Sequence, residues 1–327
     1  MSARRGARKL FVFLVAALAL SAHAFAAEPY PSKPLRLIVP FAPGGAADIL
    51  ARVVAEQLQR ELGKPIVLVN REGAGTIIGV DAAAKSTADG YTLLFSGDAA
   101  TINTASGRAL PYDLMRDLKP ITLVFSSAQF VVAGAKDTRF NSMQDLVKYA
   151  KAHPDTLKFG TSGVATSTHL STETINAAAG IKAVHVPFKG IAPALNNVQG
   201  GHVDYAVAGS SAAVPAVNGG QLKALAVTSR TRSPVLPQVP TLIEQGVNAE
   251  TSSWYGVLVP AGTPPQIVKR LHTDLMTALK APEVLERFKA LGGEARPTTP
   301  EQAAEFMREE IRRYAALMRK LGIKVTD

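Results

Sequence analysis

Residues 35–62, LRLIVPFAPGGAADILARVVAEQLQREL, contain one complete strand–turn–helix unit. Leu35–Val39 is a short apolar run rich in β-branched residues, which predicts a buried strand. From Asp48 to Leu62 the apolar side chains recur at a spacing near 3.6 residues, which predicts an amphipathic helix. Gly63 and Pro65 follow the last apolar residue and predict the end of that helix.

The same unit recurs along the chain. Further strands are predicted at residues 66–69, 91–95, 157–159, 183–187, 203–207, 222–227 and 255–259. Further helices are predicted at residues 73–85 (after a loop), 142–152, 166–179, 191–198, 264–279, 282–291 and 300–321. Asn141 and Gln144 predict a capping box at the start of the helix over 142–152. This alternation predicts an α/β fold with mainly parallel sheets covered by helices.

Two interruptions predict how the sheets divide. Ile121–Ala133 is too long for an ordinary strand and contains Ser126 and Ser127 at its middle, where we expect it to break. The proline-rich run Ser233–Pro240 interrupts the pattern again. We interpret both as crossings between two lobes, with the middle of the chain in one lobe and both ends in the other. A cleft between two lobes is the default place for a ligand.

The first 26 residues predict a secretory signal peptide. A cationic start is followed by an uninterrupted apolar stretch over residues 10–20, and small residues allow cleavage after Ala24 or Ala26. The apolar stretch is shorter than the roughly 20 residues that span a bilayer, so a membrane anchor is disfavoured. We therefore expect an exported protein that resides in a bacterial periplasm.

Composition excludes several classes of protein. The absence of cysteine excludes disulfide scaffolds, zinc–cysteine folds and thiol enzymes. The formal charge is +10, but four bases and no acid lie in residues 1–26. The rest of the chain is only mildly basic and has no run of lysine and arginine, so no nucleic-acid partner is expected.

The turn after the first strand is a candidate anion site. It reads PFAPGGAAD over residues 40–48, and the residues that we assign to the site are Phe41, Pro43, Gly44, Gly45, Ala46 and Asp48. Glycines leave backbone N–H groups uncovered, and the first N–H groups of a helix attract carboxylate or phosphate. For Asp48, a role as a first-turn or capping acid is favoured over direct ligand contact. The turn has neither the glycine spacing of dinucleotide sites nor a P-loop lysine.

A second turn, GTSGVATSTH over residues 160–169, joins flexible backbone to several hydroxyls. The residues assigned here are Thr161, Ser162, Gly163, Thr166 and Ser167. An enzymatic alternative makes Ser162 a nucleophile and His169 its base. That alternative is disfavoured because glycine follows Ser162 directly, which breaks the G-x-S-x-G elbow pattern.

A third turn, VPFKG over residues 186–190, again leads from a strand into a helix. Lys189 could attract an anion or cover the domain surface, and both roles stay open; Gly190 opens the helix. We interpret Trp254 and Tyr255 as core residues. The six histidines form no metal-ligand spacing, so neither a metal nor a cofactor is expected.

In this order the turns resemble the periplasmic solute receptors of the tripartite tricarboxylate transporter class, also called Bug or TctC receptors. The resemblance covers essentially the whole chain after the signal peptide. Its motifs here are YPSKP (30–34), VPFAPGGAAD (39–48), DGYTLL (89–94), VPFKG (186–190), GGHVD (200–204), LAVTS (225–229), SWYG (253–256) and PAGTP (260–264).

The resemblance implies a two-lobed periplasmic-binding-protein fold (Venus-flytrap, type II-like) with a central ligand cleft. It implies residues 27–125 plus 229–327 as lobe 1 and residues 126–228 as lobe 2. A carboxylate would sit between the turn at 41–48 and the facing turn at 161–167. At the other end of the ligand, selectivity would come from Ser96, Gly97 and Asp98 and from the loop that begins at Ala208 and Gly209.

The resemblance also implies the function: a receptor, not an enzyme, that captures a small organic acid and delivers it to membrane permease subunits. Many members carry an acidic or amide residue near Ala208, so the small pair here argues against a ligand whose amine needs an acid. We therefore expect a di- or tricarboxylate, a nicotinate-like acid or an aromatic acid. Alternatives are a receptor that docks on a membrane sensor kinase, and a periplasmic enzyme that acts on the bound acid.

Overall fold

The computed structural model describes residues 30–323, so the predicted signal peptide at residues 1–26 lies outside the described residues. The described residues fall into two units, residues 30–33 and residues 34–323. The described part of the first unit, residues 30–33, contains the cis peptide bond Tyr30–Pro31. All helices and strands below belong to residues 34–327. No helix among the described residues combines the length and the apolar character needed to cross a membrane.

The second unit is built on one mixed sheet in the order β2-β1-β3-β9-β4-β7-β5-β6, with β8 and β10 also paired to β4. The strands are β1 (Leu35–Val39), β2 (Ile66–Asn70), β3 (Thr92–Gly97), β4 (Leu118–Gly134), β5 (Lys158–Thr161), β6 (Val184–Pro187), β7 (Tyr205–Gly209), β8 (Leu222–Val227), β9 (Ser252–Pro260) and β10 (Glu294–Ala295). The α-helices are α2 (Ala46–Leu62), α3 (Ile77–Ala84), α4 (Asp98–Ala105), α5 (Leu114–Asp117), α6 (Met143–Ala152), α7 (Ser167–Ala179), α8 (Ile191–Gln199), α9 (Ser210–Asn218), α10 (Pro265–Ala278), α11 (Pro282–Ala290) and α12 (Pro300–Leu321). Short 3-10 helices lie at Ala74–Thr76 and Ile243–Gln245.

The strands and helices predicted from periodicity are confirmed to within about three residues. The predicted capping box is wrong by one position, because Ser142 and not Asn141 caps α6 by accepting from the Asp145 amide at 3.1 Å. Helices α4 and α9 were not predicted. Both begin directly at the end of a strand, with no intervening loop to signal a start.

Strand β4 is a single strand of 17 residues, so the expected break at its two central serines is wrong. The Ser127 hydroxyl donates a hydrogen bond of 3.0 Å to the Gly292 carbonyl, so the strand accommodates this serine without a break. The prediction of mainly parallel sheets is also wrong, because β4 and β9 pair antiparallel with their neighbours. Among the described strands, the parallel pairs are β1–β2, β1–β3, β5–β6 and β5–β7.

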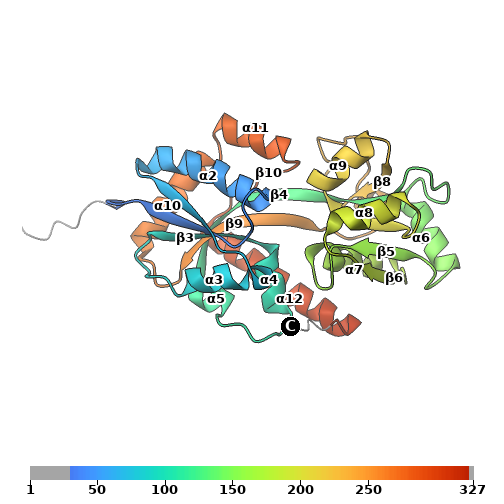
Figure 1. Ribbon diagram of the computed structural model, residues 1–327, viewed down its shortest axis with the longest axis horizontal. Helices are drawn as coiled ribbons and strands as arrows, with labels where there is room; N and C mark the ends of the chain where they lie inside the picture. Colours follow the sequence, from blue (N-terminus) through green and yellow to red (C-terminus); the bar gives the residue numbers. More distant parts are fainter. Residues whose placement is uncertain (1–29, 324–327) are drawn as a thin grey trace, which may run out of the picture. The chain divides into compact units, whose positions relative to one another are not determined.

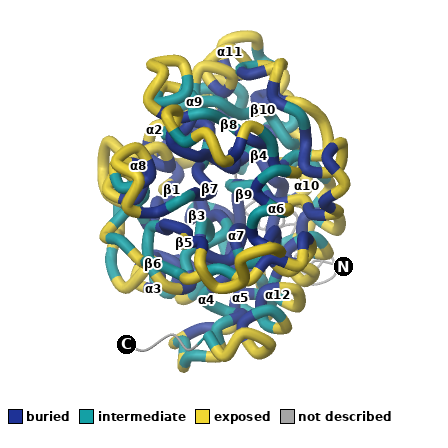
Figure 2. The backbone as a smooth tube through the Cα atoms, turned by 90° about the vertical axis from the view of Figure 1, so that its right-hand side faces the viewer, coloured by how far each residue is buried: buried dark blue, intermediate teal, exposed yellow. Residues whose placement is uncertain are grey.

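The sheet has two halves that meet on β4. In the first half, α2, α10 and α11 lie on one face and α3, α4 and α12 lie on the other (Figure 1). The strands are largely buried beneath these helices, whose outer faces are exposed (Figure 2). In the second half, the proline-rich run 233–240 packs Leu236 and Val239 against Phe130 of β4. The limits of the two lobes stay a prediction.

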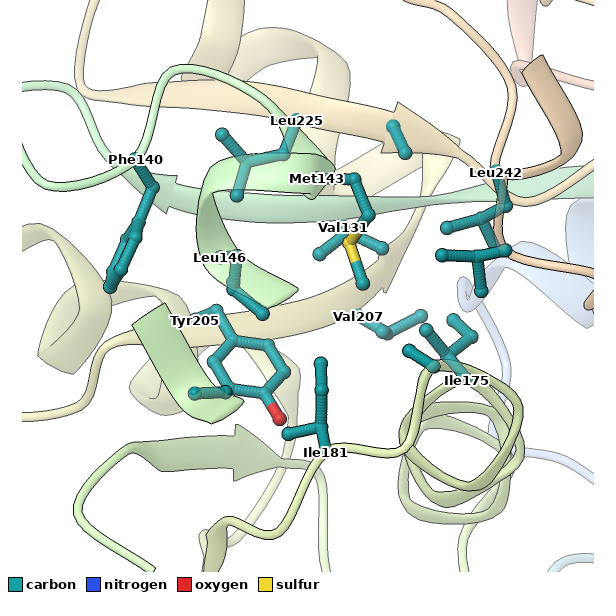
Figure 3. Packing of buried hydrophobic residues seen from close by; sticks show 14 of the residues in the cluster. Val131, Phe140, Met143, Leu146, Ile175, Ile181, Tyr205, Val207, Leu225 and Leu242 are labelled. Carbon is teal, nitrogen blue, oxygen red and sulfur yellow. The ribbon is translucent and has the colours of Figure 1, made fainter. Parts of the chain in front are cut away.

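A buried apolar cluster fixes the second half of the sheet. It joins Val131 of β4, Phe140, Leu146 of α6, Ile175 of α7 and Tyr205 of β7 (Figure 3). Burial of such side chains contributes roughly 1.5–3 kcal/mol each. The cluster therefore holds α6 and α7 on the sheet and places the start of α7 at the edge described below.

Replacing Leu146, which is 0% exposed, by alanine should lower the free energy of unfolding by about 2–5 kcal/mol, because the packed cluster cannot close the cavity. The matched control is Leu285→Ala on α11, where the side chain is 44% exposed and a change within about 0.5 kcal/mol is expected. Urea unfolding measures both. Equal losses in the two variants would show that the cluster does not carry the fold.

Candidate functional site

The register of the sheet makes two sets of strand ends point at each other. Gly97, at the end of β3, lies level with Tyr255 of β9, which pairs with Phe125 of β4. Gly209, at the end of β7, pairs with Gln129 of β4 and arrives from the opposite direction. The two levels lie four residue steps apart on β4, which corresponds to roughly 13 Å along a strand. We call these two sets of ends, with the turns that follow them, the facing edges.

The predicted site residues all lie on the facing edges. The first edge holds Phe41, Pro43, Gly44, Gly45, Ala46 and Asp48 after β1, and Ser96, Gly97 and Asp98 at the end of β3. The second edge holds Thr161, Ser162, Gly163, Thr166 and Ser167 after β5, Lys189 and Gly190 after β6, and Ala208 and Gly209 at the end of β7. Parallel pairing of β5 with β6 and β7 brings the last three turns to one side of the sheet.

The turn after β1 is held together by Asp48. Its carboxylate accepts from the Gly44 amide at 2.9 Å, from Arg52 at 2.9 and 3.1 Å, and from the Asn70 side chain at 2.9 Å. Asn70 also donates to the Phe41 carbonyl at 3.0 Å, so both ends of the turn are fixed. The hydrogen bonds from Arg52 are the main cause that lowers the pKa of Asp48 to about 2. The Asp48 carboxylate therefore has its hydrogen-bond partners within the protein. This agrees with the structural role that the sequence favours for it.

The start of α2 lies open beside this turn. Gly45 is the N-cap residue, no side chain caps the helix, and Pro43, Gly44, Gly45 and Ala46 are exposed. The Gly44 amide is already used by Asp48, and the Gly45 amide faces the Ala42 carbonyl at 3.4 Å. The amides that α2 can offer to an anion are therefore those of its own first turn, beginning at Ala46.

The end of β3 carries an acid that crosses to the second edge. Asp98 is the first residue of α4 and is partly buried. Its Oδ2 accepts a hydrogen bond of 2.9 Å from the hydroxyl of Ser167, the first residue of α7. Burial raises the pKa of Asp98 to about 6, against the opposing effect of the Ser167 bond. Of the predicted residues, this pair is the one that joins the two edges through a side-chain hydrogen bond.

Tyr255 is a site residue that sequence reasoning placed in the core. Its ring stacks on Phe95 at 5.3 Å and meets Phe41 edge-on at 5.9 Å. A Cβ on Gly97 would lie 2.4 Å from the Trp254 carbonyl and 2.9 Å from the Tyr255 ring, so only glycine fits there. Trp254 is buried as expected, but Tyr255 is only partly buried. Side chains alternate between the two faces of a strand, so the residue after the buried Trp254 is expected to point away from the core. This alternation could have identified Tyr255 from the sequence.

The turn after β5 is closed by its own hydroxyls. The Ser162 hydroxyl lies 3.1 Å from that of Thr166 and 2.9 Å from that of Thr168. The Thr161 hydroxyl contacts His185 Nε2 at 2.7 Å. His169 Nδ1 accepts from the Ala165 amide at 3.0 Å and is therefore committed to the backbone. The enzymatic alternative requires a hydrogen bond between Ser162 and His169, and these two side chains do not form one.

The turns after β6 and β7 complete the second edge. The Gly190 amide donates to the Ser162 carbonyl at 3.3 Å, which joins two turns, and the Lys189 side chain is exposed. Gly190 and Gly209 are the N-cap residues of α8 and α9, and no side chain caps either helix. Ala208 is 0% exposed and packs among apolar residues, so its side chain faces the core. Gly209 is the open position of that pair, because a Cβ there would meet nothing within 4 Å.

Neighbouring groups define the electrostatics of the site. Burial, followed by the effect of His169, lowers the pKa of His185 to about 4, and the two imidazole rings stack at 3.8 Å. Burial and the charge of Asp98 raise the pKa of Tyr255. Among residues 30–323 no group of three His, Asp or Glu side chains could hold a metal ion. The polar groups that the edges offer are therefore amides, hydroxyls, the Asp98 carboxyl and the exposed Lys189 ammonium.

Comparison with proteins of known structure supports this description of the fold. The chain is 34% identical to a protein described as a periplasmic transporter, with a TM-score of 0.75 over 90% of this chain and 99% of that one. It is 32% identical to an R. palustris protein solved with adipate (TM-score 0.75, 90% and 99% coverage). It is 29% identical to MatC from Rhodopseudomonas palustris with bound malate (TM-score 0.72, 88% and 99% coverage). The predicted two-lobed periplasmic-binding-protein fold is confirmed.

Sequence comparison gives the family. The chain is 37% identical over 302 residues to BugT of Bordetella pertussis (strain Tohama I), covering 91% of this chain and 92% of BugT. The model of the tripartite tricarboxylate transporter family receptor matches residues 50–323. The resemblance inferred from the turns is therefore confirmed, and the chain belongs to the tripartite tricarboxylate transporter receptor family, whose Bug and TctC members are solute-binding proteins.

Proposed function

We propose that this protein captures a small carboxylate metabolite between the facing edges and delivers it to a tripartite tricarboxylate-type membrane permease. In this proposal it acts in the periplasm, after cleavage of residues 1–26, as a receptor that does not turn over its ligand. The two lobes are residues 27–125 plus 229–327 and residues 126–228. The solved relatives with malate and adipate support a carboxylate as the class of ligand.

The observation that carries the proposal is the set of glycine N-caps on the facing edges. Helices α2, α4, α8 and α9 begin at Gly45, Gly97, Gly190 and Gly209, and no side chain caps them. The free N–H groups and the positive end of each helix dipole favour a negatively charged group. A ligand held by both edges stabilises the conformation in which they lie close, and the permease would recognise that conformation.

The expectation that the ligand needs no amine rested on the side chain at position 208. Because Ala208 is buried, that side chain cannot report on the ligand. The proposal therefore extends to any small carboxylate, with or without a polar substituent. Native mass spectrometry of the freshly purified protein, followed by calorimetry with the acid identified, tests it. Copurification or binding of non-carboxylate solutes alone would contradict it.

Gly45→Val should weaken carboxylate binding at least tenfold, because a branched side chain at the N-cap blocks the approach to the first amides of α2. Gly45 is the better choice than Gly44. Its φ of −76° suits any residue, whereas Gly44 has φ +79° and valine there would strain the turn. Calorimetry measures the affinity and thermal melting checks the fold. Ala281→Val, at the N-cap of α11, is the control. Similar affinity for the carboxylate in the two variants would show that the ligand does not bind at the start of α2.

Asp48→Asn should lower the free energy of unfolding by about 1–2 kcal/mol at neutral pH, since the depressed pKa of about 2 reflects stabilisation of the charged form. For a lowered pKa, this stability is present above the unfolded value near 3.8 and is lost as the pH falls toward 2. The difference in the free energy of unfolding between wild type and variant should therefore disappear as the pH falls from 3.8 to about 2. Asp274→Asn removes the partner of Arg270 in another i,i+4 pair and should cost less than about 0.5 kcal/mol.

A further inference from the structure

Two stacked histidines contact the turn after β5, which comprises residues 161–167. His169 belongs to the first turn of α7, and His185 belongs to β6. Their imidazole rings lie with centroids 3.8 Å apart and planes 11° apart, and Phe159 of β5 stacks on His185 at 5.0 Å. His169 is buried and His185 is partly buried. The proposed capture of a carboxylate by amides and hydroxyls gives neither ring a role.

The two rings contact different parts of this turn. Nδ1 of His169 accepts a hydrogen bond of 3.0 Å from the Ala165 amide. Nε2 of His185 lies 2.7 Å from the Thr161 hydroxyl, which also accepts from the Gly163 amide at 3.2 Å. Because the rings are stacked, a displacement of one ring is transmitted to the other. The pair therefore connects the start of the turn to Ala165 through side chains.

Ala165 is the part of the turn that most needs this support. Its φ is +54°, in the left-handed region that is unfavourable for a residue with a Cβ. Its side chain belongs to a buried cluster with Leu170 of α7 and Tyr314 of α12, so packing fixes the methyl group. The hydrogen bond to His169 fixes the amide. Without that bond, the backbone around Ala165 is free to return to a more favourable conformation, and the neighbouring amides would turn with it.

Both rings act on the turn as neutral groups. Since Nδ1 of His169 accepts from an amide, the proton of this ring lies on Nε2, which is 3.8 Å from Glu173. Burial, followed by the effect of His169, lowers the pKa of His185 to about 4. At neutral pH each ring therefore presents one nitrogen to the turn, Nδ1 from His169 and Nε2 from His185.

We infer that His169 and His185 are positioning residues for the proposed carboxylate site. The inference rests on the proposed function. Each imidazole acts through the turn after β5 and holds the amides and hydroxyls of residues 161–167 in one arrangement before the ligand arrives. Without either contact the turn would sample other arrangements, and the apparent affinity would fall with the fraction of receptor whose turn is competent to bind. A turn that is held in advance also spares the ligand the entropic cost of ordering it.

Substitutions that imitate one ring nitrogen at a time test the inference on the full mature chain. The side-chain amide of asparagine reaches the position of Nδ1, and that of glutamine reaches the position of Nε2. His169→Asn should keep the carboxylate affinity within about twofold of the wild type, whereas His169→Gln and His169→Leu should weaken it about three- to tenfold. At position 185 the order reverses: His185→Gln should keep the affinity, and His185→Asn and His185→Leu should weaken it.

Calorimetry measures the affinity for malate, adipate, citrate, nicotinate and benzoate, and thermal melting reports the stability of each variant. The control is His272→Leu on α10, where the imidazole contacts the Thr298 carbonyl at 3.0 Å and the wild-type affinity is expected to remain. The asparagine and glutamine variants carry the test if the leucine variants melt early.

The outcomes separate the two proposals. Equal losses of affinity for asparagine and glutamine at both positions, affinities that follow the melting temperatures, or no loss in any variant would overturn the positioning role and leave the proposed function standing. Failure of the wild type to bind any of the five acids would overturn the proposed function as well.

Discussion

The continuity of strand β4 is the constraint on which the rest of the structure depends. Its first part pairs with β9 as far as Ala128, and its last part pairs with β7 from Gln129 onward. Because β3 runs in the same direction as β4 while β7 runs against it, the carboxyl ends of the two halves must point at each other. Helices that follow parallel strands begin at those ends. The meeting of several helix starts at one place is therefore a consequence of strand direction, before any side chain contributes chemistry.

The described helices differ in the residue with which they begin. Away from the facing edges, α5, α6 and α12 begin with Asp113, Ser142 and Thr299, whose side chains accept from the first-turn amides. On the facing edges, four helices (α2, α4, α8 and α9) begin with glycine and have no side-chain cap, whereas α7 is capped by Thr166. Glycine in place of a capping side chain costs only about a few tenths of a kcal/mol of stability. Uncapped starts also occur elsewhere, at Pro264 of α10 and Ala281 of α11. Among the described α-helices, the glycine N-caps all lie on the facing edges, and glycine leaves the approach to the first amides open.

Much of this arrangement was predictable from local sequence, and the rest was not, for identifiable reasons. The periodicity after Asp48 and the glycine turns predicted α2 and placed the candidate residues on what became the facing edges. Pairing direction was mispredicted, because antiparallel contacts of β4 and β9 join residues more than a hundred positions apart and leave no local trace. Ala208 was misjudged for a similar reason: which face of a strand is buried depends on its partners. The hydrogen bond between Asp98 and Ser167 joins residues 69 positions apart and could come only from the fold.

Asp48 and Asp98 show how surroundings decide the role of one residue type. Both lie in the first turn of a helix whose N-cap is glycine, and both occupy the same edge of the sheet. Asp48 meets Arg52 and Asn70, and its pKa falls to about 2, whereas Asp98 meets hydroxyls and the field of Glu310, and its pKa rises to about 6. A helix dipole alone would lower both pKa values, so the difference must come from burial and from the presence or absence of a cation. The first acid therefore holds a turn within one edge, and the second accepts a hydrogen bond from Ser167 and so joins the two edges.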